Sequence, residues 1–300
     1  MASSPILILG GTSLVATYLA ARLNGTGRSV HLVARRAAAS PAGLPFVPWA
    51  DLATGAVPAP AGAAVISLLP LPVLISVLPR LTGIRSIAAL GSTSVFSKAT
   101  SDEESERKTA AKLAAAEQDL ENWCGTHGIG MTLLRPTLVY DLAADRNVAR
   151  LARFARRFGF VPLAKPAQGL RQPIHADDVA KALLAAVDTP AAFGKRLNIA
   201  GGATLTYRMM VERIFAGLGR KPRLVLLPTA LLRVGFSAGS RIGLVREAAF
   251  GSSVFSRMNE DLTFDIAEGL ELLGYDPRPF DPAGPLRPGD LDARTVFALT

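Results

Sequence analysis

Apolar residues in the first half of the chain alternate between short continuous runs and longer segments with helical spacing. The continuous runs are typical of strands and lie at residues 5–9, 29–33, 63–69, 84–90 and 131–134. Helical spacing over residues 14–23 and 106–123 predicts helices between them. Strands that are apolar throughout are buried on both faces, so this alternation predicts an α/β fold with a parallel sheet between helices.

The pattern becomes less regular after about residue 140. It predicts helices at 147–158, 177–187 and 206–218, strands at 197–199 and 223–227, and a helix broken by glycines over 229–249. The Pro-rich tail over residues 275–288 is expected to wrap the surface. We therefore predict a doubly wound parallel sheet from residues 1–140 plus about 172–190. A smaller C-terminal substrate lobe is predicted from about 141–171 and 191–300.

Composition narrows the class of protein. The 300 residues are 49% hydrophobic and 19% charged, which excludes a disordered or fibrous chain. The uncharged stretch between Asp51 and Arg80 contains five prolines, which favours a buried strand, a turn and a short helix over a membrane span. The N-terminus has no basic region typical of a signal peptide, so a cytoplasmic location is expected.

Cysteine, histidine and charge exclude several kinds of site. One cysteine, Cys124, excludes a disulfide framework, and three scattered histidines predict no metal site. The net charge is +9, and residues 1–100 hold seven basic residues but one acidic residue, Asp51. Because no basic run is interleaved with aromatic residues, we expect no nucleic-acid partner. A small phosphorylated cofactor fits this charge better.

The first strand leads into a small-residue turn and a helix. The segment GGTSLVA (10–16) places the N-terminus of the helix, with its unpaired N–H groups, where a phosphate would bind. Gly10, Ser13 and Ala16 occupy the glycine positions of the usual dinucleotide fingerprint, so small size is kept although only Gly10 is glycine. The alternative is an ordinary tight turn. The predicted pyrophosphate site comprises Gly10, Thr12, Ser13 and Leu14 in a Rossmann-type domain.

Two arginines, Arg35 and Arg36, end the second strand. Sites for NAD usually carry an acidic residue here that bonds the ribose 2′-hydroxyl. Guanidinium groups instead match a 2′-phosphate. The sequence therefore predicts NADP in preference to NAD, unless the two arginines are solvated surface charges.

Five further segments follow one another in an order that resembles a known family. They are LGSTSVF (90–96), KLAAAEQ (112–118), LRPTLVY (134–140), RQPIHADDVA (171–180) and LNIAGG (197–202). The chain thus resembles the extended or atypical short-chain dehydrogenase/reductases of the NAD(P)-dependent epimerase/dehydratase group. Its segment RMNEDL (257–262) is similar to the nucleoside-diphosphate-sugar epimerases among them.

The resemblance implies hydride transfer with a Tyr-x-x-x-Lys pair and a serine. Ser92 matches the serine, which orients the substrate oxygen, and Lys112 matches the lysine, which binds the nicotinamide ribose. Lys108 stands where the catalytic tyrosine is expected. The proton donor is then Lys108 with a pKa lowered by Lys112, or Tyr140, or water. Lys108 as an exposed surface lysine and Tyr140 as a packed aromatic are the structural alternatives.

The remaining candidate residues follow from the same resemblance. Besides Lys112, further cofactor-binding positions are Leu68, Leu69, Pro136 and Thr137. Substrate-facing positions are Thr93, Arg146, Asn147 and His175, although His175 is also a candidate structural residue. Asp177 is expected to cap a helix, Arg135 to serve packing or an ion pair, and Cys124 to be buried and inert.

Two functions remain open, and a third concerns a surface. The first is an NADP-dependent oxidoreductase or epimerase-like enzyme acting on a carbonyl or hydroxyl group of a small polar substrate, such as a nucleotide sugar. The second is a non-catalytic NADP-binding sensor or scaffold, because the catalytic tyrosine is missing. The third is peripheral membrane association through residues 223–250, where Leu and Val alternate with arginines. The sequence does not indicate an oligomeric state.

Overall fold

The computed structural model describes residues 4–34, 44–48, 60–141, 145, 147–232, 234–235 and 252–282. The chain forms two units, each assembled from three stretches of sequence. Unit 1 comprises Met1–Pro136, Ala176–Ile199 and Phe264–Asp276, and unit 2 comprises Thr137–His175, Ala200–Thr263 and Pro277–Thr300.

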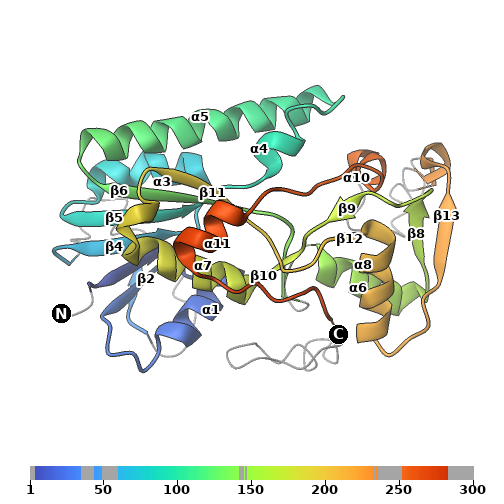
Figure 1. Ribbon diagram of the computed structural model, residues 1–300, viewed down its shortest axis with the longest axis horizontal. Coiled ribbons are helices and arrows are strands. Elements are labelled where there is room, and N and C mark those ends of the chain that lie inside the picture. The colour runs from blue at the N-terminus through green and yellow to red at the C-terminus, as the bar shows by residue number, and fades with distance from the viewer. Residues whose placement is uncertain are drawn as a thin grey trace. The chain divides into compact units, whose positions relative to one another are not determined.

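A seven-stranded parallel sheet forms the centre of unit 1 (Figure 1). Its strands are β1 (Ile6–Leu9), β2 (Val30–Ala34), β3 (Phe46–Pro48), β4 (Ala63–Ser67), β5 (Ile84–Leu90), β6 (Gly130–Pro136) and β11 (Lys195–Ile199). They lie in the order β11-β6-β5-β4-β1-β2-β3, with every pairing parallel. The order reverses between β1 and β4, the place where such sheets bind ligands at their carboxyl ends. The predicted Rossmann-type doubly wound sheet is confirmed.

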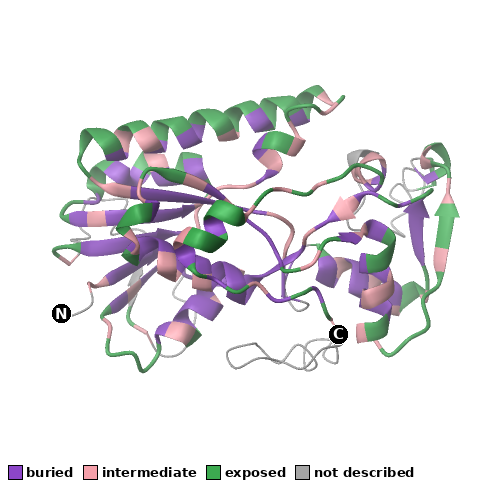
Figure 2. Ribbon diagram, in the orientation of Figure 1, coloured by how far each residue is buried: buried purple, intermediate pink, exposed green. Residues whose placement is uncertain are grey.

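Helices cover both faces of this sheet (Figure 1). On one face lie α3 (Leu71–Val77) and α5 (Glu104–Thr126), and on the other α1 (Leu14–Leu23) and α7 (Ala176–Asp188). Shorter helices are α4 (Ser94–Ser97), α11 (Ala267–Leu273) and the 3-10 turns η2 (Leu78–Arg80) and η3 (Pro190–Ala192). Every residue of β1 and β4 is buried, and Figure 2 shows the central strands of the sheet as mostly buried. Burial on both faces explains why these strands read as continuous apolar runs.

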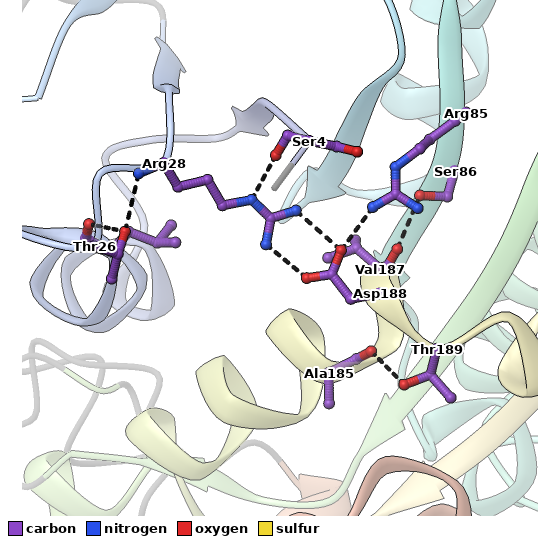
Figure 3. Close-up of polar contacts among 10 residues, drawn as sticks. Ser4, Thr26, Arg28, Arg85, Ser86, Ala185, Val187, Asp188 and Thr189 are labelled. Carbon is purple, nitrogen blue, oxygen red and sulfur yellow. Dashed lines mark hydrogen bonds and ion pairs between the residues drawn. The ribbon is translucent and has the colours of Figure 1, made fainter. Parts of the chain in front are cut away.

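Ion pairs join helix α7 to other elements of unit 1. Arg22 on α1 donates two hydrogen bonds to the fully buried Asp177 carboxylate, at 2.5 and 2.6 Å. The expected helix-capping Asp177 is therefore the partner of an arginine on a neighbouring helix. At the other end of α7, Asp188 accepts from Arg28 at 2.6 and 3.0 Å and from Arg85 at 2.6 Å (Figure 3). Arg28 also donates to the Ser4 carbonyl, which links the start of the chain to α7.

Unit 2 is built from helices and three small strand pairs. The pairs are β7 (Val139–Tyr140) with β10 (Ile174–His175), β9 (Leu170–Arg171) with β12 (Leu205–Thr206), and β8 (Val161–Ala164) with β13 (Leu224–Leu227). The described part of this unit includes the helices α6 (Val148–Phe158), α8 (Tyr207–Gly217) and α10 (Ser252–Arg257). Phe215, Phe255 and Phe280 are fully buried in its core. Thr206 caps α8 by accepting from the Met209 N–H at 3.1 Å.

The segment after α10 is tied to the strand β9 by a buried arginine. Arg171 donates to the carbonyls of Leu170, Glu260 and Arg257, and its guanidinium lies 5.2 Å from the Tyr207 ring centroid. Burial lowers the Arg171 pKa from its ordinary value. Nearby, Asn259 accepts from the Ala167 N–H at 2.7 Å. The motif that resembles sugar epimerases therefore has a structural role here.

Several expectations need correction or fall outside the described residues. The tail does not only follow the surface, because Arg278 and Phe280 are buried and the Phe280 carbonyl accepts from Arg213 at 2.6 Å. Most of the broken helix predicted over 229–249 lies outside the described residues. Among the helices of the described ranges, none is long and apolar enough to cross a bilayer.

The cluster of Asp188 with Arg28 and Arg85, drawn in Figure 3, predicts a pH-dependent contribution to stability. Partial burial acts to raise the Asp188 pKa, but hydrogen bonds and charge from Arg28 and Arg85 outweigh it and hold that pKa below its usual value. Because the Asp188 pKa is lower in the folded state, the carboxylate stabilises the fold at any pH above its unfolded-state pKa of about 4. This stabilisation is lost as the pH falls through the folded-state pKa. We expect Asp188→Asn to lower the free energy of unfolding at pH 7 by about 1 kcal/mol. Below pH about 3 the difference from wild type should narrow.

Urea unfolding at both pH values measures this effect. Asp119→Asn is the matched control, because Asp119 is an exposed carboxylate on α5. An Asp188→Asn variant as stable as the Asp119→Asn variant at pH 7 would contradict the assigned role of the cluster.

Candidate functional site

The turn between β1 and α1 brings the first predicted cofactor residues together. Gly10 has φ +90°, and a Cβ on it would lie 3.3 Å from the Leu68 Cβ. The N–H groups of Gly10 and Gly11 both donate to the Val33 carbonyl at 2.9 Å. Ser13 then caps α1 by accepting from the Ala16 N–H at 3.3 Å. A residue with a side chain at position 10 would therefore be strained and crowded.

This turn meets the chemical requirements of a pyrophosphate cradle. The first turn of α1 carries no acidic residue, so the positive end of the helix dipole is not neutralised locally. Thr12 is exposed, and Ser13 and Leu14 are half-buried, so a ligand can reach them. Ala16 is fully buried, as expected for the small residue that permits close packing of the helix. These residues fit the anionic centre of a dinucleotide.

The neighbouring strands end beside this turn. The Leu68 N–H donates to the Leu9 carbonyl at 2.9 Å, which places Leu68 directly against the start of the turn. Leu69 follows, half-buried, with its N–H 3.4 Å from the Ser67 hydroxyl. On the other side, Val33 of β2 pairs with Leu9 of β1. Arg35 and Arg36 follow β2 but lie outside the described residues, as does Arg146.

Three more predicted residues meet where β5 and β6 end. The Thr93 N–H and hydroxyl both donate to the Pro136 carbonyl, at 3.2 and 3.1 Å. The Ser92 hydroxyl oxygen accepts from the Ser94 N–H at 3.1 Å. Because that bond uses the oxygen as acceptor, the Ser92 O–H remains able to donate to a substrate oxygen. Thr93 is buried and Ser92 is half-buried, so Ser92 is the more accessible of the two.

A buried ion pair supports the turn that carries Ser92. Arg135 on β6 donates to the Glu117 carboxylate on α5, and Glu117 is 1% exposed. A Cβ on Gly91 would lie 3.1 Å from Glu117 Oε1, so the residue before Ser92 must be small. The Arg135 guanidinium also lies 4.9 Å from the Phe96 ring centroid. The prediction of an ion pair or packing role for Arg135 is confirmed, whereas Glu117 was not singled out as its partner.

The two lysines of α5 are exposed. Lys108 forms an ion pair with Glu104 at 2.7 Å, and its side chain is 70% exposed. Lys112 is exposed as well. At 100° per residue, Lys112 is about 140° around the helix from the buried Glu117. The half-buried Leu113 precedes Glu117 by one turn, and Lys112 precedes the buried Ala116 by one turn, so Lys112 lies beside the buried side of the helix. The exposure of Lys108 agrees with the alternative that it is a surface lysine.

Tyr140 and His175 belong to unit 2 and contact each other there. Tyr140 is 2% exposed, and its ring packs edge-on against His175 at 5.2 Å and Phe280 at 4.8 Å between centroids. This environment agrees with the alternative that Tyr140 is a packed aromatic. The Thr137 hydroxyl in the same unit donates to the Gln172 carbonyl.

The start of α6 holds the remaining substrate candidate. Asn147 is exposed, and its N–H donates to the Asp145 carboxylate at 2.8 Å. Asp145 also accepts from the Ala149 N–H and so caps this helix, while burial raises its pKa above the ordinary value.

Two further expectations concern metal ligands and the cysteine. Within the described part of the chain, no three His, Cys, Asp or Glu side chains are grouped closely enough to hold a metal ion. Cys124 is buried, and burial raises the pKa of its thiol to about 12. A thiol with so high a pKa is not nucleophilic at neutral pH, as the sequence predicts.

Glu117 and Glu121 offer a direct test of the buried ion pair. Both lie on α5 and pair with an arginine of a strand, but Glu121 contacts Arg196 at the surface. We expect Glu117→Gln to lower the free energy of unfolding by about 3 kcal/mol, because the buried Arg135 loses its counter-charge. Glu121→Gln should cost less than about 1 kcal/mol. Equal losses in chemical denaturation would show that the Glu117 pair is not special.

The chain is similar to proteins of known family and structure. Residues 71–200 match the model of the NAD dependent epimerase/dehydratase family. A curated relative, the NADH dehydrogenase [ubiquinone] 1 alpha subcomplex subunit 9, mitochondrial, of Arabidopsis thaliana, is 30% identical over 98 residues. That match spans 32% of this chain and 24% of the relative.

Solved structures share the fold across nearly the whole chain. A putative epimerase from Burkholderia cenocepacia J2315 superimposes with a TM-score of 0.71 at 15% identity, covering 99% of both chains. UDP-N-acetylglucosamine 4-epimerase from Bacillus cereus gives 0.67 at 16% identity, also covering 99% of both. MoeE5 in complex with UDP-glucose and NAD gives 0.67 at 19% identity and 98% of both. The family match agrees with the resemblance read from the sequence: residues 71–200 are similar to the NAD dependent epimerase/dehydratase family, and the sheet has a Rossmann-type fold.

Proposed function

We propose that this chain binds NADP across the carboxyl ends of β1 and β4. The observation that carries the proposal is the Gly10–Ser13 turn, which lies against Leu68 with no room for a side chain at position 10. In this arrangement the N-terminus of α1 faces the pyrophosphate. Two similar structures, both of MoeE5, are complexes with NAD, which supports a dinucleotide ligand for this fold.

In this proposal, different residues along the carboxyl edge of the sheet bind different parts of the dinucleotide. Gly10, Thr12, Ser13 and Leu14 hold the pyrophosphate, and Leu68 and Leu69 cover it from β4. Arg35 and Arg36 follow the end of β2 in the sequence and bind the 2′-phosphate of NADP. The ends of β5 and β6, with Ser92 and Pro136, lie beyond β4 and serve the nicotinamide end.

The first candidate activity is that of an epimerase-like oxidoreductase. When bound, the cofactor supplies hydride exchange with a carbon that bears a hydroxyl or carbonyl group. Ser92 donates its O–H to that substrate oxygen and thereby orients it. Neither Lys108, exposed and paired with Glu104, nor Tyr140, packed between rings, is well placed as proton donor. A water molecule at Ser92 is the donor that we propose.

Nucleotide sugars are the substrate class to test first. The similar structures of MoeE5 are complexes with UDP-glucose and with UDP-glucuronic acid. The substrate-side residues that we propose from the sequence are Thr93, Arg146, Asn147 and His175, whereas Thr137 is proposed to bind the cofactor.

The second candidate is a non-catalytic NADP-binding subunit or scaffold. It is favoured by Lys108, which stands where the resemblance expects the catalytic tyrosine and instead pairs with Glu104 at the surface. The curated relative of Arabidopsis thaliana is itself named as a subunit of a larger complex. In this case the cofactor is bound but not turned over.

Cofactor selectivity tests the binding site. We expect Arg35→Ala to weaken NADPH binding about tenfold and to leave NADH binding unchanged, because NADH has no 2′-phosphate. Titration followed by nicotinamide fluorescence measures both. Arg80→Ala, which removes an exposed arginine of the same unit, is the control. Equal weakening of both cofactors would contradict the role of Arg35.

Ser92→Ala separates the two candidate functions. If the chain is an oxidoreductase, turnover in a panel of carbonyl compounds and nucleotide sugars should fall roughly 100-fold, the usual effect of losing one donor to a reacting oxygen. NADPH affinity should be unchanged. Hydride transfer that is undetectable in the wild type with bound NADPH would reject the enzyme and leave the scaffold.

A further inference from the structure

A surface of unit 2 combines exposed apolar side chains with an excess of positive charge. Residues 147–165 and 218–235 contain nine basic residues and no acidic one, as many charges as the net +9 of the whole chain. Six large apolar residues in these segments are at least 36% exposed. They are Phe158, Phe160, Val225, Leu226, Leu231 and Val234, and we call them the apolar edge.

Hydrogen bonds join the two segments into one surface. The Val161 N–H donates to the Arg223 carbonyl at 2.9 Å, where β8 begins to pair with β13. Arg220 donates to the Arg156 carbonyl at 2.8 Å, which ties the start of β13 to α6. The Arg157 guanidinium lies 5.1 Å from the centroid of the Phe158 ring. Cations and apolar groups are therefore interleaved.

The exposure of β13 indicates what kind of partner covers it. In the described part of the chain β13 pairs with β8 alone, so its second edge carries no ladder. Val225 and Leu226 are neighbours on a strand and point to opposite faces, yet both are exposed. Exposed apolar side chains set among basic residues match an anionic bilayer surface, which offers negative charge and an apolar layer together. Leu231 and Val234, just after the strand, are 58% and 68% exposed.

We propose that the apolar edge and its basic surroundings bind the surface of an anionic lipid bilayer. Apolar side chains enter the boundary between headgroups and acyl chains, and the arginines and lysines attract the negative surface charge. This binding does not depend on the proposed cofactor function, because every residue used lies in unit 2.

Co-sedimentation with lipid vesicles tests the proposal in the full-length protein. Vesicles of phosphatidylcholine are compared with an equimolar mixture of phosphatidylcholine and phosphatidylglycerol. We expect binding to the anionic vesicles alone, and a loss of binding as salt is raised. Absence of binding to anionic vesicles, or equal binding to both compositions, would overturn the proposal.

Two pairs of substitutions locate the surface. Leu231→Ser with Val234→Ser removes apolar contacts, and Lys221→Glu with Arg223→Glu reverses exposed charges. Each pair should weaken vesicle binding at least tenfold. Val73→Ser with Leu270→Ser is the control, since these residues of unit 1 are 37% and 36% exposed and should not affect binding.

Circular dichroism and urea unfolding check that each variant is folded. Vesicle binding that survives both unit 2 pairs would reject the apolar edge. So would sedimentation of the wild type as a dimer that the same substitutions dissociate, without any affinity for vesicles, because a second copy would then be the partner.

Discussion

The close approach of Gly10 to Leu68 is the constraint on which the proposed site depends. The sheet reverses its strand order between β1 and β4, so the chain must turn sharply as it leaves β1. A left-handed glycine makes that turn, and its missing side chain lets β4 continue beside it. Ser13 then begins α1 within three residues, with its N-terminus at the same edge of the sheet. Fold and anion site therefore share one local geometry.

Much of unit 1 was predictable because its signals are local. Continuous apolar runs identify buried parallel strands, and the helix predicted over residues 14–23 matches α1. The small residues at the fingerprint positions also lie as predicted: Gly10 makes the turn against Leu68, Ser13 caps α1 and Ala16 is buried. What the sequence did not show is which residues meet across long separations. Glu117 pairs with Arg135, and Asp177 pairs with Arg22. These contacts arise from the packing of elements that lie far apart in the sequence, and the spacing of apolar residues does not reveal them.

The catalytic residues show the same limit more clearly. Lys112 aligns with a family lysine by sequence, but a helix presents a residue according to its angle around the axis. Lys108 and Lys112 are both exposed on α5, although Lys112 lies one turn before the buried Ala116, so the roles of these lysines stay predictions. Tyr140 ends a strand, as ligand-facing residues often do, yet it fills the core of unit 2. Exposure is a property of the folded chain, and single motifs do not encode it.

A crystal structure of the protein with NADPH tests the central claim most directly. We predict that the pyrophosphate oxygens of NADPH lie at the N–H groups of the Gly10–Leu14 turn, and that its adenosine end lies beyond β2. A dinucleotide bound elsewhere, or a side chain filling the space in front of Ser13 when the cofactor is present, would contradict it.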